Sequence, residues 1–474
     1  MSVDFLHIIK QVFSFVFIYN KRSSNNVQEF AGKSRLCICY LDKKKMKRII
    51  YSFLIGLLFV PFLYENCEFI EFKPLAGVYS TTAQPDFKIK EWFEGNYQAN
   101  YEKYIEHNVG LRNFFVRVKN QFDYSLFNIS NAAKVIVGKD GYLFEQNYID
   151  AYLGTDFAGE AAISDKVRKI KNVQSALKKK NIDLIVALAP GKASFYPEYI
   201  PSQYNLQKKK SMNYDWILKR SYDAGINVID LAGYLLSMKQ NEQYPLMPKT
   251  GIHWSYYGMT FCADTLIKYM ENLRQIKMPR LEWSELEVSE IPRDPDNDLG
   301  DLMNLLWDIS FPPLAYPKIY FTTEGKVKPK VLVVGDSYYW NLQNAGIIEN
   351  VFANQDFWYY NYEIYSNRQK QQQTVNDIDF RAEVEKNDFI ILLTTDAGTA
   401  NVGYGFIDKA YEIYASKNDS PKDTVAINRN IQRIKSDPAW MEAIRKKAGE
   451  KNISIEDMII IDAEWLTEED AKKK

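Results

Sequence analysis

Histidine and cysteine are scarce in this sequence. Its 474 residues include 3 histidines and 4 cysteines, and their spacing resembles neither a zinc site nor a disulfide framework. Zinc sites in proteins draw mainly on these two residue types, so we expect no structural or catalytic zinc. We also expect no cofactor, although a metal site made of carboxylates alone stays open.

The chain also lacks net charge. Lys plus Arg and Asp plus Glu number 60 each, so there is no overall basic field of the kind that favours nucleic acid. Aromatic residues make up 15% of the chain and include 33 tyrosines. Such rings can stack on sugars, but Tyr, Lys, Asn, Ile and Phe are all common here, as AT-rich codons would give. Composition alone therefore carries no functional weight.

One apolar run stands out near the N-terminus. Residues 49–64 carry no charge and follow the basic tripeptide that starts at Met46, which is the pattern of a secretory signal. The run is slightly short for a span of about 20 residues, and no small-x-small cleavage site follows it. We interpret 46–66 as an uncleaved signal anchor, with a cleaved signal peptide and a buried core helix as alternatives.

The basic residues before this run place the carboxyl part of the chain outside the cytoplasm. Residues 1–45 lack clear periodicity, and we interpret them as an upstream extension of the reading frame, with Met46 as the true start. Residues 67–130 are polar and aromatic, with apolar side chains at helical spacing, so we expect a helical neck.

Beyond the neck, the pattern is that of an α/β protein. Asp140-Gly141 between two apolar runs predicts a hairpin over 134–144. After residue 160, uncharged β-rich runs alternate with amphipathic helices, which predicts a mostly parallel sheet between helices. The expected strands are 182–188, 226–230, 331–334, 357–363, 389–393 and 458–462, and the expected helices are 164–180, 207–223, 253–274, 405–416 and 424–448.

The strand at 331–334 leads directly into Gly335, Asp336 and Ser337. Functional sites of open α/β sheets lie at the carboxyl ends of strands. A serine on a tight turn after a buried strand can present its Oγ to a substrate. The alternative is a plain strand-to-helix turn in which Asp336 or Ser337 caps the helix. The N–H of Ser337 or Tyr338 is the candidate oxyanion donor.

A serine nucleophile needs a base, and His253 is the candidate. His7 lies in the doubtful leader and His107 in the neck. No carboxylate precedes His253 locally, so the acid that orients its imidazole must come from elsewhere in the chain. The candidates are Asp336, Asp298, Asp301 and Asp230, with Thr250 or a backbone carbonyl as further alternatives.

Five motifs in order resemble a known family. They are Gly138-Lys-Asp-Gly-Tyr-Leu-Phe144, Ala189-Pro-Gly-Lys-Ala-Ser-Phe-Tyr-Pro-Glu198, His253-Trp254 with Gly258, Gly335-Asp-Ser337 and Gly403-Tyr-Gly-Phe-Ile407. Over about residues 100–465 the chain is similar to the alginate O-acetyltransferase AlgX/AlgJ group, which consists of extracytoplasmic SGNH-hydrolase-like proteins also grouped as DHHW proteins.

The resemblance implies a fold. Residues 131–474 would form a three-layer, flavodoxin-like SGNH hydrolase domain with a mostly parallel sheet. It would be circularly permuted, because His253 precedes Ser337. A helical extension and a membrane anchor would precede it.

The resemblance also implies an activity and partners. The activity is O-acetyl transfer onto a secreted or cell-surface polysaccharide in the bacterial cell envelope. The protein would be anchored in the inner membrane with its catalytic domain in the periplasm or otherwise outside the cytoplasm. A membrane protein of the MBOAT class would supply the acetyl group, and no nucleic acid is involved.

Site residues follow from the matched motifs. Ser337 would be the nucleophile and carry the acetyl ester, with His253 as the base. The family has an Asp two residues before this His, where the chain has Gly251. The residues expected to line the site or support it are Gly335, Tyr338, Lys192, Tyr196, Thr395 and Asn401.

Three functional hypotheses remain open. The first is an O-acetyltransferase acting on an exopolysaccharide. The second is a carbohydrate O-acetyl esterase that uses the same Ser–His pair, with water replacing the sugar hydroxyl. The third is a non-catalytic glycan-binding or assembly subunit that kept the fold and lost the acid.

Overall fold

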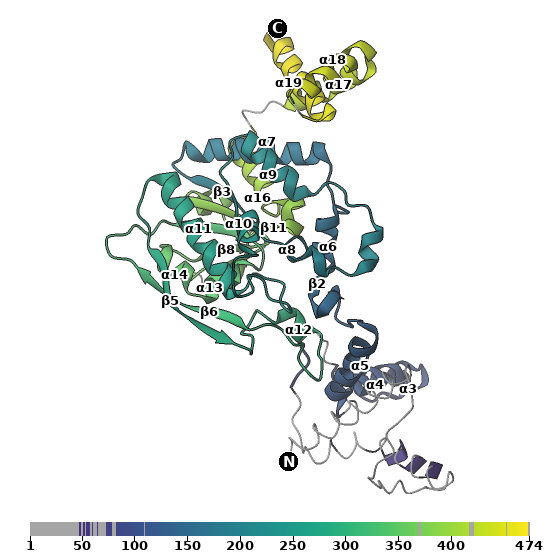
Figure 1. Cartoon of the computed structure of the whole chain (residues 1–474). Coiled ribbons are helices and arrows are strands. Elements are labelled where there is room, and N and C mark those ends of the chain that lie inside the picture. The colour runs from purple at the N-terminus through teal and green to yellow at the C-terminus, as the bar shows by residue number, and fades with distance from the viewer. Residues whose placement is uncertain are drawn as a thin grey trace, which may run out of the picture. The chain divides into compact units, whose positions relative to one another are not determined.

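The computed structural model in Figure 1 describes residues 73–77, 82–108, 110–367, 371–416, 421–451 and 453–472, with scattered residues between 47 and 64. The leader 1–45 and most of the apolar segment 46–66 lie outside the described residues. In the described part of the chain, no helix is long and apolar enough to cross a membrane. The chain divides into two compact units, Met1–Asn131 with Asp301–Asp308, and Ala132–Gly300 with Ile309–Lys474.

The smaller unit contains the helices α3 (Ile89–Phe93), α4 (Asn96–Asn108) and α5 (Arg112–Phe127). Asn304 ties the segment 301–308 to this unit, because its Oδ1 accepts the N–H of Ala76 at 2.8 Å and its Nδ2 donates to the Ala76 carbonyl at 3.1 Å. Asn120 of α5 donates to the carbonyl of Met303 at 2.9 Å. The helical spacing of the neck corresponds to α4 and α5.

A seven-stranded sheet forms the centre of the larger unit, in the order β10-β9-β8-β7-β11-β3-β4. β8, β7, β11, β3 and β4 run parallel, and β9 and β10 are antiparallel. The expectation of an α/β fold is therefore confirmed, with a mixed sheet. The strands are β3 (Asp183–Ala189), β4 (Val228–Asp230), β7 (Val331–Gly335), β8 (Asp356–Tyr359), β9 (Glu363–Tyr365), β10 (Gln373–Thr374) and β11 (Phe389–Thr395).

Helices cover both faces of this sheet (Figure 1). On one face, α7 (Glu160–Lys178), α9 (Asn213–Asp223) and α16 (Phe406–Tyr414) share one buried apolar cluster with alternate residues of the central strands. Another group consists of α10 (Leu231–Met238), α11 (Tyr256–Arg274), α13 (Tyr339–Asn344) and α14 (Ile347–Val351), and α10 contacts β3. Every residue of β3, β7 and β11 is buried, as expected for mainly apolar strands inside a covered sheet.

Shorter elements connect these strands and helices. The predicted hairpin is present as β1 (Val135–Val137) and β2 (Leu143–Glu145), with Asp140 and Gly141 both at positive φ in the turn. The other short elements are α6 (Gln146–Leu153), α8 (Lys192–Phe195), η2 (Pro197–Tyr199), η3 (Ser202–Leu206), α12 (Asp298–Leu302), α15 (Phe380–Val384) and η4 (Asp396–Asn401).

Two strand predictions were wrong. The single strand expected at 357–363 is divided into β8 and β9, because Tyr360 and Asn361 adopt positive φ and turn the chain back. The segment 458–462 lies within α19 (Ile455–Lys472), where Met458, Ile459 and Ala463 face a small core at helical spacing. With α17 (Pro421–Ser436) and α18 (Pro438–Lys451), α19 forms a helical bundle, so the helix expected at 424–448 is interrupted near Pro438.

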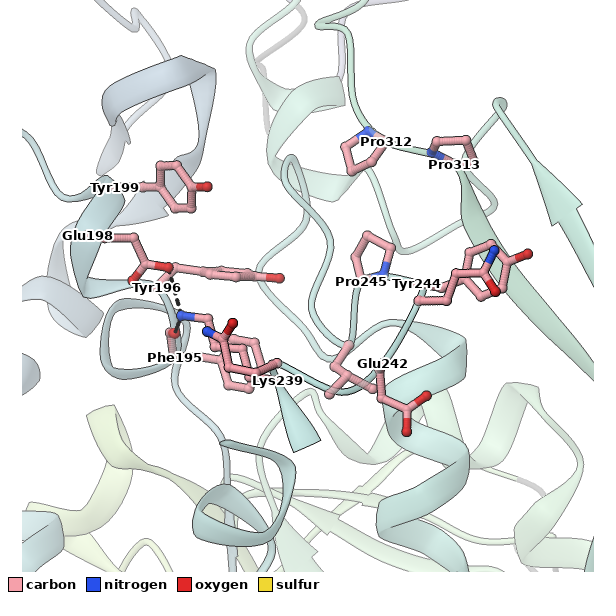
Figure 2. A pocket seen from close by; sticks show the side chains of 13 residues that line it. Phe195, Tyr196, Glu198, Tyr199, Lys239, Glu242, Tyr244, Pro245, Pro312 and Pro313 are labelled. Atoms are coloured by element: carbon pink, nitrogen blue, oxygen red, sulfur yellow. Dashed lines mark hydrogen bonds and ion pairs between the residues drawn. The ribbon is translucent and has the colours of Figure 1, made fainter. Parts of the chain in front are cut away.

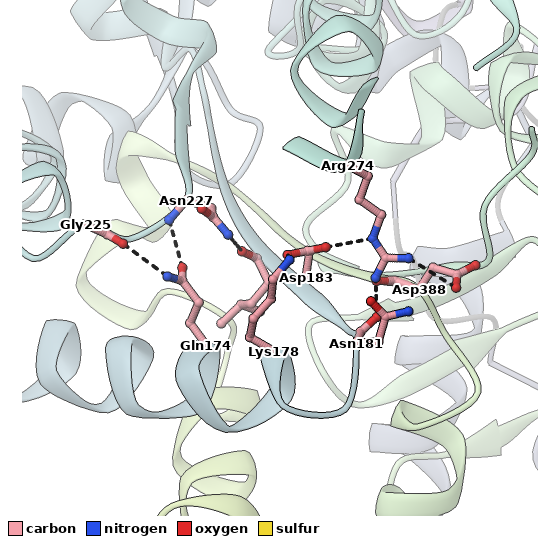
Figure 3. A network of polar contacts seen from close by, with 9 residues as sticks. Gln174, Lys178, Asn181, Asp183, Gly225, Asn227, Arg274 and Asp388 are labelled. Atoms are coloured by element: carbon pink, nitrogen blue, oxygen red, sulfur yellow. Dashed lines mark hydrogen bonds and ion pairs between the residues drawn. The ribbon is translucent and has the colours of Figure 1, made fainter. Parts of the chain in front are cut away.

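Arg274, the last residue of α11, holds the amino ends of two central strands together (Figure 3). Its Nε lies 2.7 Å from an oxygen of Asp183 on β3, and its Nη2 donates to the carbonyl of Asp388 at 2.7 Å. The Lys178 ammonium pairs with the other Asp183 oxygen at 2.7 Å, and the Asp183 side chain is 1% exposed. The network therefore fixes α11, whose other end follows the His253 loop, against β3 and β11.

Arg274→Met is expected to lower the free energy of unfolding by about 3 kcal/mol, because a buried carboxylate loses its main partner. Urea denaturation of the variant measures this loss through the transition midpoint. Lys268→Met on the same helix is the matched control, since the Lys268–Asp264 pair has a lysine side chain that is 66% exposed. Its effect is expected to stay within about 0.5 kcal/mol. Equal losses in the two variants would contradict the assigned role of Arg274.

Candidate active site

Three side chains from distant parts of the larger unit meet beyond the carboxyl end of β7. Ser337 follows this strand, His253 lies in the loop before α11, and Asp298 starts α12. His253 Nε2 is 2.8 Å from Ser337 Oγ, and His253 Nδ1 is 2.7 Å from an oxygen of Asp298. An ionised carboxylate only accepts hydrogen bonds, so Nδ1 donates to Asp298 and Nε2 is left to accept from the Ser337 hydroxyl.

The carboxylate of Asp298 is held by backbone donors on its other oxygen. The N–H groups of Ile252 and Leu299 donate to Oδ1 at 2.9 and 2.7 Å. One of these donors precedes His253 directly, so the same carboxylate fixes both the imidazole and the chain that carries it. Among the acids considered from the sequence, Asp298 is the one that contacts His253.

The side chain of Asp336 makes no described hydrogen bond with His253 and contacts other groups. Its carboxylate accepts from the N–H of Tyr338 at 3.1 Å, the N–H of Thr395 at 3.2 Å and the hydroxyl of Tyr404 at 3.1 Å. It thereby joins the carboxyl ends of β7 and β11. Burial raises the pKa of Asp336 above its ordinary value, against the lowering effect of these donors. Asp230 is also elsewhere, because it caps α10 through the N–H of Gly233.

Of the two candidate oxyanion donors, the N–H groups of Ser337 and Tyr338, one remains available. The N–H of Tyr338 is taken by Asp336, so the expectation that it faces an oxyanion is corrected. Within the described part of the chain, the N–H of Ser337 makes no hydrogen bond. Tyr338 supports the base instead: its hydroxyl donates to the carbonyl of Ile252 at 2.8 Å, and its ring lies 5.0 Å from the His253 ring.

Lys192 is fully buried and does not line a substrate surface. Its ammonium donates to the carbonyls of Lys249, at 2.8 Å, and Gly251. Burial lowers the pKa of Lys192 to about 7. Because both acceptors precede His253 by a few residues, Lys192 positions the loop that carries the base.

The position of the family's acid has no room for a side chain. A Cβ on Gly251 would lie 2.7 Å from the carbonyl oxygen of Asp296 and 2.8 Å from the ring of Pro248. Gly335 is similarly confined, since an added Cβ would lie 2.7 Å from the carbonyl oxygen of Leu393 on β11. These glycines allow two backbone segments to approach closely at the edge of the site.

Two of the three remaining sequence candidates, Thr395 and Asn401, make no described contact with Ser337 or His253. Thr395 is buried and contributes its N–H to Asp336. Asn401 is exposed at the end of η4, and no described contact links it to Ser337 or His253. Sequence reasoning missed Glu145, whose charge acts on His253 and whose pKa is raised by burial and by Asp298. Its position directly after the matched hairpin motif is the signal that could have found it.

Burial opposes protonation of His253, but Asp298, Asp336 and Glu145 together raise the pKa of His253 above its ordinary value of 6.5. The hydrogen bond that His253 donates to Asp298 is the largest of the raising causes. Among the described residues, no group of three or more His, Cys, Asp or Glu side chains could hold a metal ion. The contacts of Ser337, His253 and Asp298 provide the groups for chemistry with a serine, a base and an acid.

The pH dependence should follow this imidazole. A general base acts when neutral, so the rate of acyl transfer is expected to rise with pH and level off above a pKa higher than 6.5. In Asp298→Asn the acid limb should move to lower pH, because the main cause that raises the pKa is removed. The dependence of kcat/KM on pH, measured with p-nitrophenyl acetate, gives the acid limb of the unaltered protein and of the variant. An unmoved acid limb in the variant would contradict the assignment.

Comparison with known proteins agrees with this fold. Residues 135–345 match the family model described as SGNH hydrolase-like domain, acetyltransferase AlgX. The resemblance to the AlgX/AlgJ group that the sequence predicts is confirmed for this segment. In this domain the chain order is His253, Asp298, Ser337.

Curated relatives are probable alginate O-acetylases AlgJ. The protein from Pseudomonas aeruginosa is 29% identical over 211 residues, covering 44% of this chain and 49% of the relative. That from Azotobacter vinelandii is 27% identical over 215 residues, covering 45% and 51%. The chain thus spans about half the length of the curated relatives it matches. The solved O-acetyltransferase domain of Pseudomonas putida AlgJ gives a TM-score of 0.39 at 16% identity, covering 56% of this chain and 92% of that domain.

Proposed function

We propose that this protein is an extracytoplasmic O-acetyltransferase that acts on a secreted or cell-surface polysaccharide through an acetyl ester on Ser337. The observation that carries the proposal is the position of His253 between Asp298 and Ser337, at 2.7 and 2.8 Å. A hydroxyl, an imidazole and a carboxylate in this order constitute an activated serine nucleophile.

In the first half-reaction, the Ser337 hydroxyl gives its proton to His253 Nε2 while Oγ attacks the carbonyl carbon of the acetyl donor. The Ser337 N–H is the backbone donor available to the oxyanion, and one such donor contributes about 10²- to 10³-fold in rate. Collapse breaks the bond to the donor's leaving oxygen, which takes the proton from His253. Asp298 stabilises the imidazolium during this step.

In the second half-reaction, a sugar hydroxyl gives its proton to His253 as its oxygen attacks the acetyl carbonyl. The bond to Ser337 Oγ then breaks, and Oγ regains a proton from His253. The products are an O-acetylated sugar and the free enzyme. The chemistry needs no cofactor, because the acetyl group passes between two oxygens without a change in oxidation state.

The partners follow from the family resemblance. The acceptor is a polysaccharide of the bacterial envelope, and the acetyl donor is a membrane protein of the MBOAT class. Attachment to the inner membrane would use the apolar segment 46–66, which precedes the described domains. The order of His253 before Ser337 supports the permuted connectivity expected for this group.

Two rival functions are compatible with the same fold. An esterase would form the same acetyl ester and release it to water. A non-catalytic assembly subunit is the rival that Gly251 in place of the family's acid suggests, but the contact between His253 and Asp298 supports an acid from another part of the chain. The transferase is preferred because the relatives are named O-acetylases.

Partition between sugar and water tests the proposal. The purified chain would be incubated with p-nitrophenyl acetate and increasing oligosaccharide, and acetylated sugar and free acetate would be quantified by mass spectrometry. Acetylated sugar that rises with acceptor concentration and is absent in Ser337→Ala supports the transferase. Acetate alone at every acceptor concentration identifies an esterase. Activity equal to that of Ser337→Ala contradicts both enzymatic functions.

A further inference from the structure

A cavity of about 460 Å³ lies beside the loop that leads to His253. Figure 2 shows its two walls, with Tyr196, Glu198 and Tyr199 on one side and Pro245, Pro312 and Pro313 on the other. This volume lies within the range of small-ligand sites, roughly 300–1,000 Å³. None of the catalytic side chains lines it, so it is a separate feature of the domain.

The lining combines flat rings with polar ends. Tyr196, Tyr199 and Tyr244 supply phenol rings, and the prolines supply a rigid apolar surface. Aromatic faces pack against apolar surfaces, while a phenol hydroxyl or a carboxylate offers hydrogen bonds at the rim. A pyranose ring has both properties, with C–H faces and hydroxyl groups around its edge.

The charges of the cavity disfavour an anion. Its lysine, Lys239, is already neutralised, because its ammonium lies 2.7 Å from Glu198 Oε1 and also donates to the Phe195 carbonyl at 2.5 Å. Glu242 adds a second carboxylate, which accepts from the hydroxyl of Tyr257 at 2.6 Å. The lining therefore has two carboxylates and one lysine, so it carries one net negative charge. A uronate carboxylate entering it would face this charge, and the one ammonium among the described lining residues is already paired with Glu198.

Hydrogen bonds connect the cavity wall to the loop that carries His253. The hydroxyl of Ser255, two residues after His253, donates to the carbonyl of Pro245 at 2.7 Å, and its N–H donates to the carbonyl of Leu246 at 3.0 Å. Tyr196 donates to the carbonyl of Met247 at 3.1 Å. A ligand held by these walls would thus lie against the same loop that carries His253.

We propose that this cavity is a subsite for the acceptor glycan. The cavity binds an uncharged or amino-bearing pyranose and rejects a uronate. The inference rests on the proposed function, which supplies the polysaccharide as acceptor. It adds that the cavity distinguishes sugars by their charge. It separates this chain from its relatives named for alginate, which is a polymer of uronates.

Three trisaccharides test the selection: cellotriose, which is neutral, the glucosamine trimer of chitosan, which is cationic, and trimannuronate, which is anionic. Their affinities for the purified full chain would be measured by isothermal titration at neutral pH and low salt. Cellotriose or the chitosan trimer is expected to bind at least about tenfold more tightly than trimannuronate. Equal or tighter binding of trimannuronate would overturn the proposal.

Glu198→Gln tests whether the preference for uncharged or cationic sugars arises in this cavity. The change keeps the side-chain shape and frees Lys239 to pair with an anion, so trimannuronate should bind more tightly and the gap between the sugars should narrow. Glu285→Gln is the matched control, because Glu285 also pairs with a lysine, Lys318, away from this cavity. A gap unchanged by Glu198→Gln, or narrowed equally by Glu285→Gln, would contradict the location.

Tyr199→Ala tests the contact surface. All binding trisaccharides are expected to lose about three- to tenfold in affinity when the ring is removed. Unchanged affinities would overturn the subsite. Acetyl-enzyme formation with no trisaccharide binding would contradict only the subsite, whereas selective binding with no acetyl transfer would contradict only the catalytic function.

Discussion

Asp298→Asn is expected to lower the rate of acyl transfer about 10⁴-fold, since an amide in place of the orienting carboxylate favours the wrong imidazole tautomer. In the protein, Asp298 accepts from His253 Nδ1 at 2.7 Å and leaves Nε2 to face Ser337. An asparagine can turn its NH₂ toward Nδ1, which then needs its lone pair and places the proton on Nε2. The Ser337 hydroxyl would lose its acceptor.

Steady-state hydrolysis of p-nitrophenyl acetate measures this effect. Asp301→Asn is the matched control, because Asp301 is one turn along the chain and its side chain is 47% exposed in an ion pair with Lys73. The control should retain the rate of the unaltered protein. A rate loss below about tenfold in Asp298→Asn would contradict its role as the acid.

Gly251→Asp, which restores the residue typical of the family, is expected to damage the site. Its Cβ would lie 2.7 Å from the carbonyl oxygen of Asp296, so the loop that carries His253 must shift. A displacement of about 1 Å in a catalytic group can cost about 10²-fold in rate. Lys192 would lose its geometry as well, because it donates to the Gly251 carbonyl.

The informative comparison is between Asp298→Asn and the double variant that also carries Gly251→Asp. If Asp298 alone can orient the base, Gly251→Asp will not restore activity to Asp298→Asn. Gly449→Asp on α18 is the control for the substitution itself, since no atom lies within 4 Å of an added Cβ there. Rescue of Asp298→Asn by Gly251→Asp would show that an acid at position 251 can also orient His253, and it would contradict the claim that Asp298 alone can do so.

The candidate nucleophile and the candidate base could be predicted from the sequence because their signals are local. Ser337 directly follows an uncharged run and a glycine, and His253 stands out because the chain has only 3 histidines. The acid could not be singled out. Asp298 lies in a polar loop with several other acids, and its contact with His253 depends on how that loop folds back onto residue 252.

Other differences have equally specific causes. The antiparallel pair β5 (Arg280–Ser289) and β6 (Leu314–Thr322) was not predicted, because a register shift between Trp283 and Leu286 interrupts the alternation of apolar and polar residues. The apolar run at 458–462 is short enough to fit a strand or a helix, and packing against α17 and α18 decided the outcome.

Trapping of the acetyl-enzyme tests the central claim most directly. The chain would be incubated with p-nitrophenyl acetate, stopped with acid, and examined by intact mass and peptide mapping. One acetyl group is expected on Ser337, absent in Ser337→Ala and formed much more slowly in His253→Ala. An acetyl group on another residue, or no adduct and no turnover above the Ser337→Ala level, would contradict the account.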